Sequence, residues 1–346
     1  MSTIVLTGGG TAGHIMPHIA LKPHLDKHFT KVVYIGSKNG MEKDIITKHG
    51  GFEFYPITTV KLDRKKLFNN LLIPIKFLKG KHEAKKLLKQ LNPCVIFSKG
   101  GYVALPVVSA AKKLRIPVVA HESDLSMGLA NKLSKNKCSC ICTTFDKTAQ
   151  GVGKKGVFTG SPIIVNNTTI AKPKTNKPIL LITGGSQGAK SINQVVFDCI
   201  DDLCKNFYVI HQVGKNNINH NIKNSDYTQI EFSNNMQALI KNADIVVSRA
   251  GSNTIFELAS YHKPMLLIPL PKGASRGDQI ENAQYFEDLG YCKVLYQQDC
   301  TTKTLPKAIT NLFSNKKQYI DTLKNANLSN GTEKILNVIL TYKKPY

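Results

Sequence analysis

The chain has 346 residues, which is more than one ordinary hydrophobic core encloses and enough for two. Hydrophobic residues make up 42% of the chain and charged residues only 20%, a balance that excludes extended disorder. The 47 lysines and arginines outnumber the 23 acids and give a net charge of +24, which favours an anionic partner.

Targeting segments and disulfide frameworks are not evident in the sequence. No apolar run approaches the roughly 18 residues of a membrane-spanning helix, and Met1–Leu6 reads as a first strand rather than a signal peptide. The eight cysteines lack framework spacing, which favours a reducing, cytoplasmic compartment. Cys138, Cys140 and Cys142 have no fourth ligand nearby, so we expect buried small side chains and no metal.

Short β-branched runs alternate with helix-length segments along the whole chain, which predicts an α/β protein with two parallel sheets covered on both faces. The expected strands are Thr3–Thr7, Val32–Ile35, Cys94–Phe97, Pro117–Ala120, Ser139–Thr143, Ile179–Thr183, Tyr208–Gln212, Asp244–Ser248 and Met265–Ile268. The polar stretch Asn166–Lys177 predicts a linker between the two doubly wound domains.

Four loops follow expected strands at the edge where such sheets bind ligands. They are Gly8–His14, Lys99–Tyr102, Gly184–Gly188 and Ser248–Glu257. Glycines allow close approach of the backbone, and helix N-termini offer unpaired N–H groups to phosphate. Two loops from each half, facing across a cleft, suit a ligand with a central diphosphate.

Three phosphate ligands fit such loops, and the sequence disfavours two of them. Gly8, Gly10 and Gly13 satisfy the dinucleotide pattern, but the second strand ends at Ser37 without the acid that holds a ribose. Gly184–Ser191 misses a P-loop because Ala189 replaces its last glycine. A nucleotide-sugar remains. The chain has no Asp-x-Asp, so we expect neither metal nor organic cofactor, with backbone N–H groups carrying the diphosphate charge.

Taken together, these loops resemble the peptidoglycan N-acetylglucosaminyltransferase (MurG) family over essentially the whole chain. The matching segments are GGGTAGH at 8–14, SKGGYVALP at 98–106, HESDLSMGLANK at 121–132, GGSQGAKSIN at 184–193, RAGSNTIFE at 249–257 and DQIENA at 278–283. The resemblance implies the GT-B fold of two Rossmann-like domains. It also implies transfer of N-acetylglucosamine from UDP-N-acetylglucosamine to the undecaprenyl-linked muramyl-pentapeptide lipid I, giving lipid II.

The resemblance assigns the domains as well. Residues 1–161 and 331–346 form the domain that binds the acceptor and the membrane. The last helix, from about residue 331, crosses back onto this domain. Residues 162–330 form the UDP-sugar domain. The family acts at the cytoplasmic face of the cell membrane as a peripheral protein, in peptidoglycan synthesis, cell shape and division.

The family's donor contacts transfer by position, while the base and the acceptor contacts are inferred from their places beside the glycine loops. His14 is the expected catalytic base, with Asp124 and Glu122 as rivals, and Gly100, Gly101 and Tyr102 are expected at the acceptor. The expected donor contacts are Thr11, Ala12, Gly13, Asp124, Ser186, Gln187, Ser233, Arg249, Ser252, Asn253, Thr254, Glu257 and Gln279. Two positions depart from the family, which often has Asn at 124 and Arg at 164, where this chain has Asp124 and Ile164. Arg249 or Arg276 would have to compensate for the missing cation.

The segment from Lys61 to Leu91 mixes lysines with large aliphatic residues. This pattern fits a surface lying on anionic lipid and equally fits a core-facing helix with a solvated lysine face. Nucleic acid is disfavoured, because only four of the basic residues are arginine and tryptophan is absent. Another GT-B glycolipid synthase, acting on diacylglycerol, is the alternative enzyme.

Overall fold

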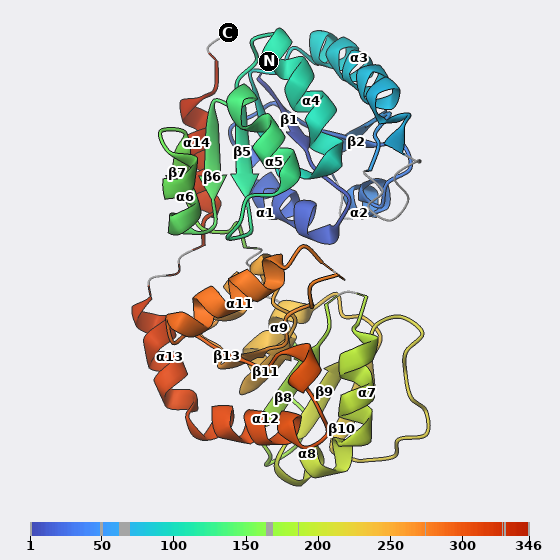
Figure 1. Ribbon diagram of the computed structural model, residues 1–346, viewed down its shortest axis with the longest axis vertical. Helices are drawn as coiled ribbons and strands as arrows, with labels where there is room; N and C mark the ends of the chain where they lie inside the picture. Colours follow the sequence, from blue (N-terminus) through green and yellow to red (C-terminus); the bar gives the residue numbers. More distant parts are fainter. Residues whose placement is uncertain are drawn as a thin grey trace. The chain divides into compact units, whose positions relative to one another are not determined.

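The computed structural model describes residues 2–48, 51–61, 70–163, 169–185, 187–273, 275–326, 328 and 330–344. The chain divides into two compact units (Figure 1). The N-terminal unit comprises Met1–Ile164 and Asn330–Tyr346, and the C-terminal unit comprises Val165–Ser329. Parts of the expected linker, with Ile164, and of the lysine-rich segment, with residues 62–69, lie outside the described residues.

The N-terminal unit is built on seven parallel strands in the order β3-β2-β1-β4-β5-β6-β7. The strands are β1 (Thr3–Thr7), β2 (Lys31–Ser37), β3 (Glu53–Ile57), β4 (Val95–Ser98), β5 (Val118–Glu122), β6 (Cys140–Thr143) and β7 (Gly156–Phe158). Ile4 of the central strand β1 pairs with Val32 on one side and Val95 on the other. Every residue of β1 is buried because helices cover both faces of the sheet.

The helices of this unit are α1 (Met16–Leu25), α2 (Glu42–Lys48), α3 (Ile73–Leu91), α4 (Gly101–Lys113), α5 (Leu129–Ser134), α6 (Asp146–Val152) and α14 (Thr332–Thr341), with the short 3-10 helices η1 (Ala12–His14) and η3 (Lys135–Lys137). Ile4 and Leu6 pack on one face with α1 and α14, while Val5 packs on the other with α3 and α4 (Figure 1). The last helix of the chain therefore completes the core of the first domain.

The C-terminal unit has six parallel strands in the order β10-β9-β8-β11-β12-β13. They are β8 (Ile179–Thr183), β9 (Tyr208–Gln212), β10 (Tyr227–Ile230), β11 (Ile245–Ser248), β12 (Met265–Leu267) and β13 (Lys293–Val294). The helices are α7 (Lys190–Asp198), α8 (Ile200–Asn206), α9 (Met236–Asn242), α10 (Ser252–Ser260), α11 (Asp278–Asp288), α12 (Thr304–Ser314) and α13 (Lys316–Asn325), with η4 (Gln297–Asp299). One core joins Leu180 and Ile182 of β8 to α7, α8 and α12.

All nine expected strands are present, with ends that differ by at most two residues. Four strands were not expected, namely β3, β7, β10 and β13. Each of them is the edge strand of its sheet.

All eight cysteines are unpaired and buried, four in each unit. Within the described ranges, no helix is long and apolar enough to cross a membrane. Over the same ranges, no group of three or more His, Cys, Asp or Glu side chains is arranged to hold a metal ion.

Candidate active site

Two glycine loops meet at the carboxyl edge of the N-terminal sheet. The loop 8–14 follows β1 and the turn 99–102 follows its neighbour β4. Gly101 has φ +76°, and a Cβ atom on it would lie 2.3 Å from the carbonyl oxygen of Gly9. A Cβ atom on Gly10 would lie 2.7 Å from the Tyr102 ring. Only glycine permits this contact, because any side chain would force the two loops apart.

His14 ends η1 immediately before α1, and its Nδ1 lies 2.7 Å from the hydroxyl of Thr11. When Nδ1 carries the proton and donates it to Thr11, Nε2 holds a lone pair and is able to accept a proton from a substrate hydroxyl. The pair thus supports the expected base at His14. It also gives Thr11, which was expected at the donor, a second part in orienting the ring.

Glu122 ends β5 with its carboxylate turned inward. Its oxygens accept hydrogen bonds from the amide of Asp124 at 3.1 Å, the amide of Gly128 at 2.8 Å and the side-chain amide of Asn131 at 2.9 Å. A buried carboxylate with three donors organises the surrounding loop. Of the two acids expected as rivals to His14, Asp124 is therefore the better placed for proton transfer, because its side chain is only partly buried.

Lys99 lies beneath these loops and is 2% exposed. Its Nζ lies 2.7 Å from Nδ1 of His121 and 2.5 Å from the hydroxyl of Ser123. Burial lowers the pKa of Lys99 to about 7, against the opposing effect of the nearby carboxylates of Glu122 and Asp124. Nε2 of His121 lies 3.1 Å from the carbonyl oxygen of Gly160. Burial and the charge of Lys99 lower the pKa of His121, so this ring is neutral.

His18, near the start of α1, is buried by packing rather than exposed at the surface. Its ring makes edge contacts with Tyr34, at 5.1 Å between centroids, and with Phe97, at 5.5 Å. Burial lowers its pKa well below the ordinary value, so it too is neutral.

In the C-terminal unit, the first turn of α10 is made by Ser252, Asn253 and Thr254 after the buried strand β11. The first backbone N–H groups of a helix have no partner within it, and the helix dipole favours an anion there. One turn further on, Glu257 accepts a hydrogen bond from the Gln237 side chain at 2.8 Å. Burial raises the pKa of Glu257, and the bond from Gln237 opposes that shift.

The loop 184–188 after β8 is connected to Ser233 through Gln212. The side-chain amide of Gln212 donates to the Gly185 carbonyl at 3.0 Å, and its oxygen accepts from the Ser233 amide at 3.2 Å. Gly188 has φ +74°, and a Cβ atom on it would lie 2.0 Å from the Val213 carbonyl oxygen. Gln187 is exposed on this loop. Ser186, the expected contact, lies outside the described residues.

Gln279, at the start of α11, accepts a hydrogen bond from the Leu270 amide at 3.0 Å. This bond fixes the orientation of the Gln279 side-chain amide. A fixed amide is suited to the expected contact with a sugar hydroxyl.

Arg249 makes contacts within its own unit. One guanidinium nitrogen donates to the carbonyls of Ile268 and Pro269, at 3.1 and 3.3 Å, and another donates to Ser191 and Gln297, at 3.1 and 2.7 Å. Arg249 therefore joins the ends of β11 and β12 to α7 and η4. Nε of Arg276 lies 3.6 Å from Oδ1 of Asp278.

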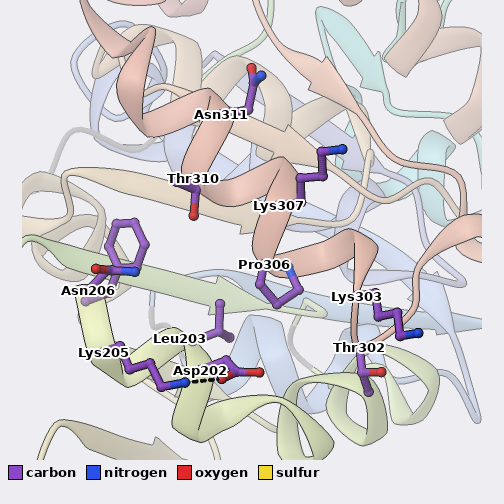
Figure 2. A pocket seen from close by; sticks show the side chains of 11 residues that line it. Asp202, Leu203, Lys205, Asn206, Thr302, Lys303, Pro306, Lys307, Thr310 and Asn311 are labelled. Carbon is purple, nitrogen blue, oxygen red and sulfur yellow. Dashed lines mark hydrogen bonds and ion pairs between the residues drawn. The ribbon is translucent and has the colours of Figure 1, made fainter.

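The pocket in Figure 2 belongs to the C-terminal unit. Its volume is about 700 Å³, and it is lined by residues of α8 and α12 next to the amino end of β9. Its rim carries the exposed ion pair between Lys205 and Asp202, at 2.6 Å. The glycine loops follow the carboxyl ends of strands, so we assign this pocket no part in the site.

Two family models match the chain. The glycosyltransferase family 28 N-terminal domain matches residues 4–143, and the family 28 C-terminal domain matches residues 179–338. A transferase from Clostridium botulinum strain Langeland is 44% identical, with 99% of this chain and 100% of the relative covered. It is named UDP-N-acetylglucosamine–N-acetylmuramyl-(pentapeptide) pyrophosphoryl-undecaprenol N-acetylglucosamine transferase. The transferase of the same name from Clostridium tetani is 43% identical, with 98% of each chain covered.

The chain belongs to the MurG family of N-acetylglucosamine transferases. The crystal structure of Acinetobacter baumannii MurG has the same fold, with a TM-score of 0.77, 24% identity and coverage of 99% of this chain and 100% of that one. The glycosyltransferase of kitacinnamycin, at 13% identity, also matches with a TM-score of 0.77 and 99% coverage of both chains. The doubly wound, two-domain fold expected from the sequence is thus confirmed.

In this member of the MurG family, three residues of the site were missed from the sequence. They are Lys99, Asn131 and Gln212, and all three are buried polar side chains that hold loops together. The signal available for Lys99 was a lysine inside a Gly-Gly turn directly after an apolar strand, where a charged residue is out of place.

Proposed function

We propose that this chain transfers N-acetylglucosamine from UDP-N-acetylglucosamine to the C4 hydroxyl of the muramyl sugar of lipid I, giving lipid II in peptidoglycan synthesis. The supporting observation is the near-complete match, at 44% identity, to transferases that carry this activity in their name. The glycine loops and the N-terminus of α10, each at the carboxyl end of a strand, agree with a diphosphate-linked donor.

The proposed reaction is a single displacement with inversion. The C4 oxygen of the acceptor forms a bond to the anomeric carbon while the bond from that carbon to the diphosphate oxygen breaks, and its electron pair leaves with UDP. The hydroxyl proton passes to Nε2 of His14. Backbone N–H groups of the α10 first turn receive the developing diphosphate charge, and Glu257 accepts from the ribose hydroxyls.

We also propose that no organic cofactor takes part and that a divalent metal is not required. This proposal rests on the chain's lack of an Asp-x-Asp pair and on the helix N-terminus as a source of positive potential. Turnover that is unchanged by an excess of chelator is the expected result. Loss of turnover on chelation, restored by added magnesium, would contradict it.

The membrane surface is the remaining proposed partner, bound from the cytoplasmic side by the N-terminal unit. The α3 helix buries Gly80, Ala84 and Leu88 and leaves its opposite face in solvent. There Ile75 and Leu78 are 65% and 61% exposed beside exposed lysines, and Leu71, just before the helix, is 75% exposed. An exposed aliphatic face with lysines favours the lipid surface over the core-facing alternative.

One assay tests the reaction. UDP release is measured from UDP-N-acetylglucosamine with a lipid I analogue, with diacylglycerol and without acceptor. We expect release that depends on the lipid I analogue and a product that is heavier by one N-acetylglucosamine. Release that depends on diacylglycerol instead would identify the alternative, a glycolipid synthase.

A further inference from the structure

The buried amine of Lys99 is not used in the reaction described above, yet it lies between the two parts of the N-terminal site. Its backbone amide bonds to the Thr7 carbonyl at 2.9 Å, where β1 turns into the first glycine loop. Its Nζ reaches His121 and Ser123, on and just after β5. Lys99 thus connects the loop that carries His14 to the segment that carries Asp124.

The hydrogen bonds of this cluster have a fixed direction at one end. Nε2 of His121 faces the Gly160 carbonyl oxygen, so this nitrogen carries the proton and Nδ1 is an acceptor. Lys99 must therefore donate to His121 in either of its protonation states. With its proton, Lys99 also donates to the Ser123 hydroxyl. Without it, the amine still has two N–H groups for His121 and Ser123, but the charge that attracts the carboxylates of Glu122 and Asp124 is lost.

The charged groups around Lys99 come from several elements. Glu122, at the end of β5, and Asp124, just after it, stabilise its charge. Cys142 of β6 is also nearby, but its hydrogen bond with Cys140 and its burial raise its pKa well above the ordinary value, so it is a neutral thiol. His121 and His18 are buried neutral bases beside it, and the charge of Lys99 helps to keep both of them neutral. Lys99 is therefore the group of this buried cluster that gains or loses a charge near neutral pH.

We propose that the protonated amine of Lys99 is a positioning group that holds the 122–124 segment in its working place, and that loss of the proton releases this segment. The inference rests on the proposed function in one respect, because that function places Asp124 at the transfer site. It makes Lys99 a residue that couples turnover to pH without touching either substrate.

The first test needs no substrate. The full-length protein, labelled with carbon-13 at lysine Cε, is titrated by NMR from pH 5.5 to 9, and the Lys99 signal is assigned by its absence from Lys99→Met. We expect the Lys99 signal to titrate near pH 7, ahead of the other lysines, and the amide signals of Ser123 and Asp124 to shift with the same midpoint. A Lys99 signal or Ser123 amide that does not move across this range would overturn the proposal.

The second test is the pH profile of transfer to the lipid I analogue. We expect kcat of the wild type to fall above about pH 7 as Lys99 loses its proton. Lys99→Met should lose this decrease of kcat with pH. Its kcat at the plateau should be about ten- to a hundredfold lower, because the 122–124 segment is misplaced. Its KM for the donor should stay within threefold of the wild type. Lys99→Arg, which keeps its charge at all these pH values, should retain the plateau and lose the decrease.

Lys155→Met serves as the matched control. The Lys155 amine donates to the Cys138 carbonyl at 2.7 Å in the same unit, away from the loops. Its profile should match the wild type. A decrease of kcat with pH that survives in Lys99→Met would overturn the proposal. Absence of transfer in the wild type would instead refute the proposed function, while the NMR titration would still decide the role of Lys99.

Discussion

At the scale of single residues, the hydrogen bond between Thr11 and His14 occupies one ring nitrogen. When Nδ1 donates to the Thr11 hydroxyl, at 2.7 Å, the acceptor lone pair lies on Nε2. The arrangement resembles other proton-transfer sites in which a second group orients the histidine. Asp124 is the competing base, so variants of the two residues have to be compared.

We expect His14→Ala to lower kcat about a hundredfold, because proton transfer in the transition state loses its acceptor. KM for UDP-N-acetylglucosamine should change less than threefold. Steady-state UDP release with the lipid I analogue measures both, with the exposed His28→Ala as control. Near-normal turnover in His14→Ala together with its loss in Asp124→Asn would move the base to Asp124.

Lys99 also makes the free energy of unfolding depend on pH, and its lowered pKa fixes the direction of that dependence. The pKa of Lys99 is about 7 in the folded protein and returns to about 10.5 on unfolding. Between these values the unfolded chain binds more protons, so this residue makes the free energy of unfolding rise with pH. Below pH 7 the buried charge costs up to about 5 kcal/mol, since one pKa unit corresponds to about 1.4 kcal/mol.

The difference in unfolding free energy between Lys99→Met and the wild type should therefore shift against the variant as pH rises from 6 to 9. Urea denaturation at several pH values measures it. The comparison cancels the titration of groups that Lys99 does not influence. A difference that is constant with pH would show that Lys99 is not held with a lowered pKa.

The candidates that the sequence offered lie on loops with an unusual glycine pattern, such as His14 and the first turn of α10. Lys99, Asn131 and Gln212 were not foreseen, because their importance depends on burial and on partners distant in the chain. Asn131, for example, meets Glu122 only because α5 packs back on β5. Sequence spacing does not contain that information.

At the scale of elements, the same distinction separates the strands that were predicted from those that were missed. Central strands of a parallel sheet are covered on both faces and read as apolar runs, as β1 and β8 do. The edge strand β3 has the sequence EFYPI and is largely uncovered, and β10 has no fully buried residue. Their pairing comes from the neighbouring strand rather than from their own composition.

The prediction at the scale of elements concerns the contact between the two glycine loops at Gly101. Gly101→Ala adds a methyl group against the Gly9 carbonyl at a positive φ, so we expect it to destabilise the N-terminal unit by about 3 kcal/mol. Gly151→Ala, in α6 with nothing within 4 Å of the added atom, should instead stabilise by about 0.5 to 1 kcal/mol. Urea denaturation of both variants checks the contrast. Equal effects would mean that the two glycine loops do not pack as described.

At the scale of the whole molecule, the surplus of positive charge and the exposed face of α3 belong together. In the proposed membrane binding, the basic residues would attract an anionic surface over a distance and the aliphatic side chains of α3 would add short-range burial. The division into two α/β domains was predictable from the sequence, because strands followed by glycine-rich loops occur in both halves of the chain. The exposure of Ile75 was not, since the same periodicity fits a buried helix.

We expect the protein to sediment with anionic phospholipid vesicles and to be released by high salt. Ile75→Ser should weaken vesicle binding about tenfold, as expected for one aliphatic side chain withdrawn from lipid. Leu289→Ser, an exposed apolar residue of the C-terminal unit, should have no effect. Binding that is insensitive to lipid charge or to Ile75→Ser would refute the role of α3.

The eight buried thiols allow the unfolding of each unit to be followed by counting the cysteines that react. Burial raises the pKa of Cys138 to about 11 and of Cys199 to about 12, so neither reacts until its surroundings open. Because each half holds four, alkylation under mild urea followed by mass spectrometry should yield species with four added groups if the halves melt separately and eight if they melt as one. Peptide mapping then tells which half yields first. Rapid labelling without urea would show that the thiols are accessible in the folded state.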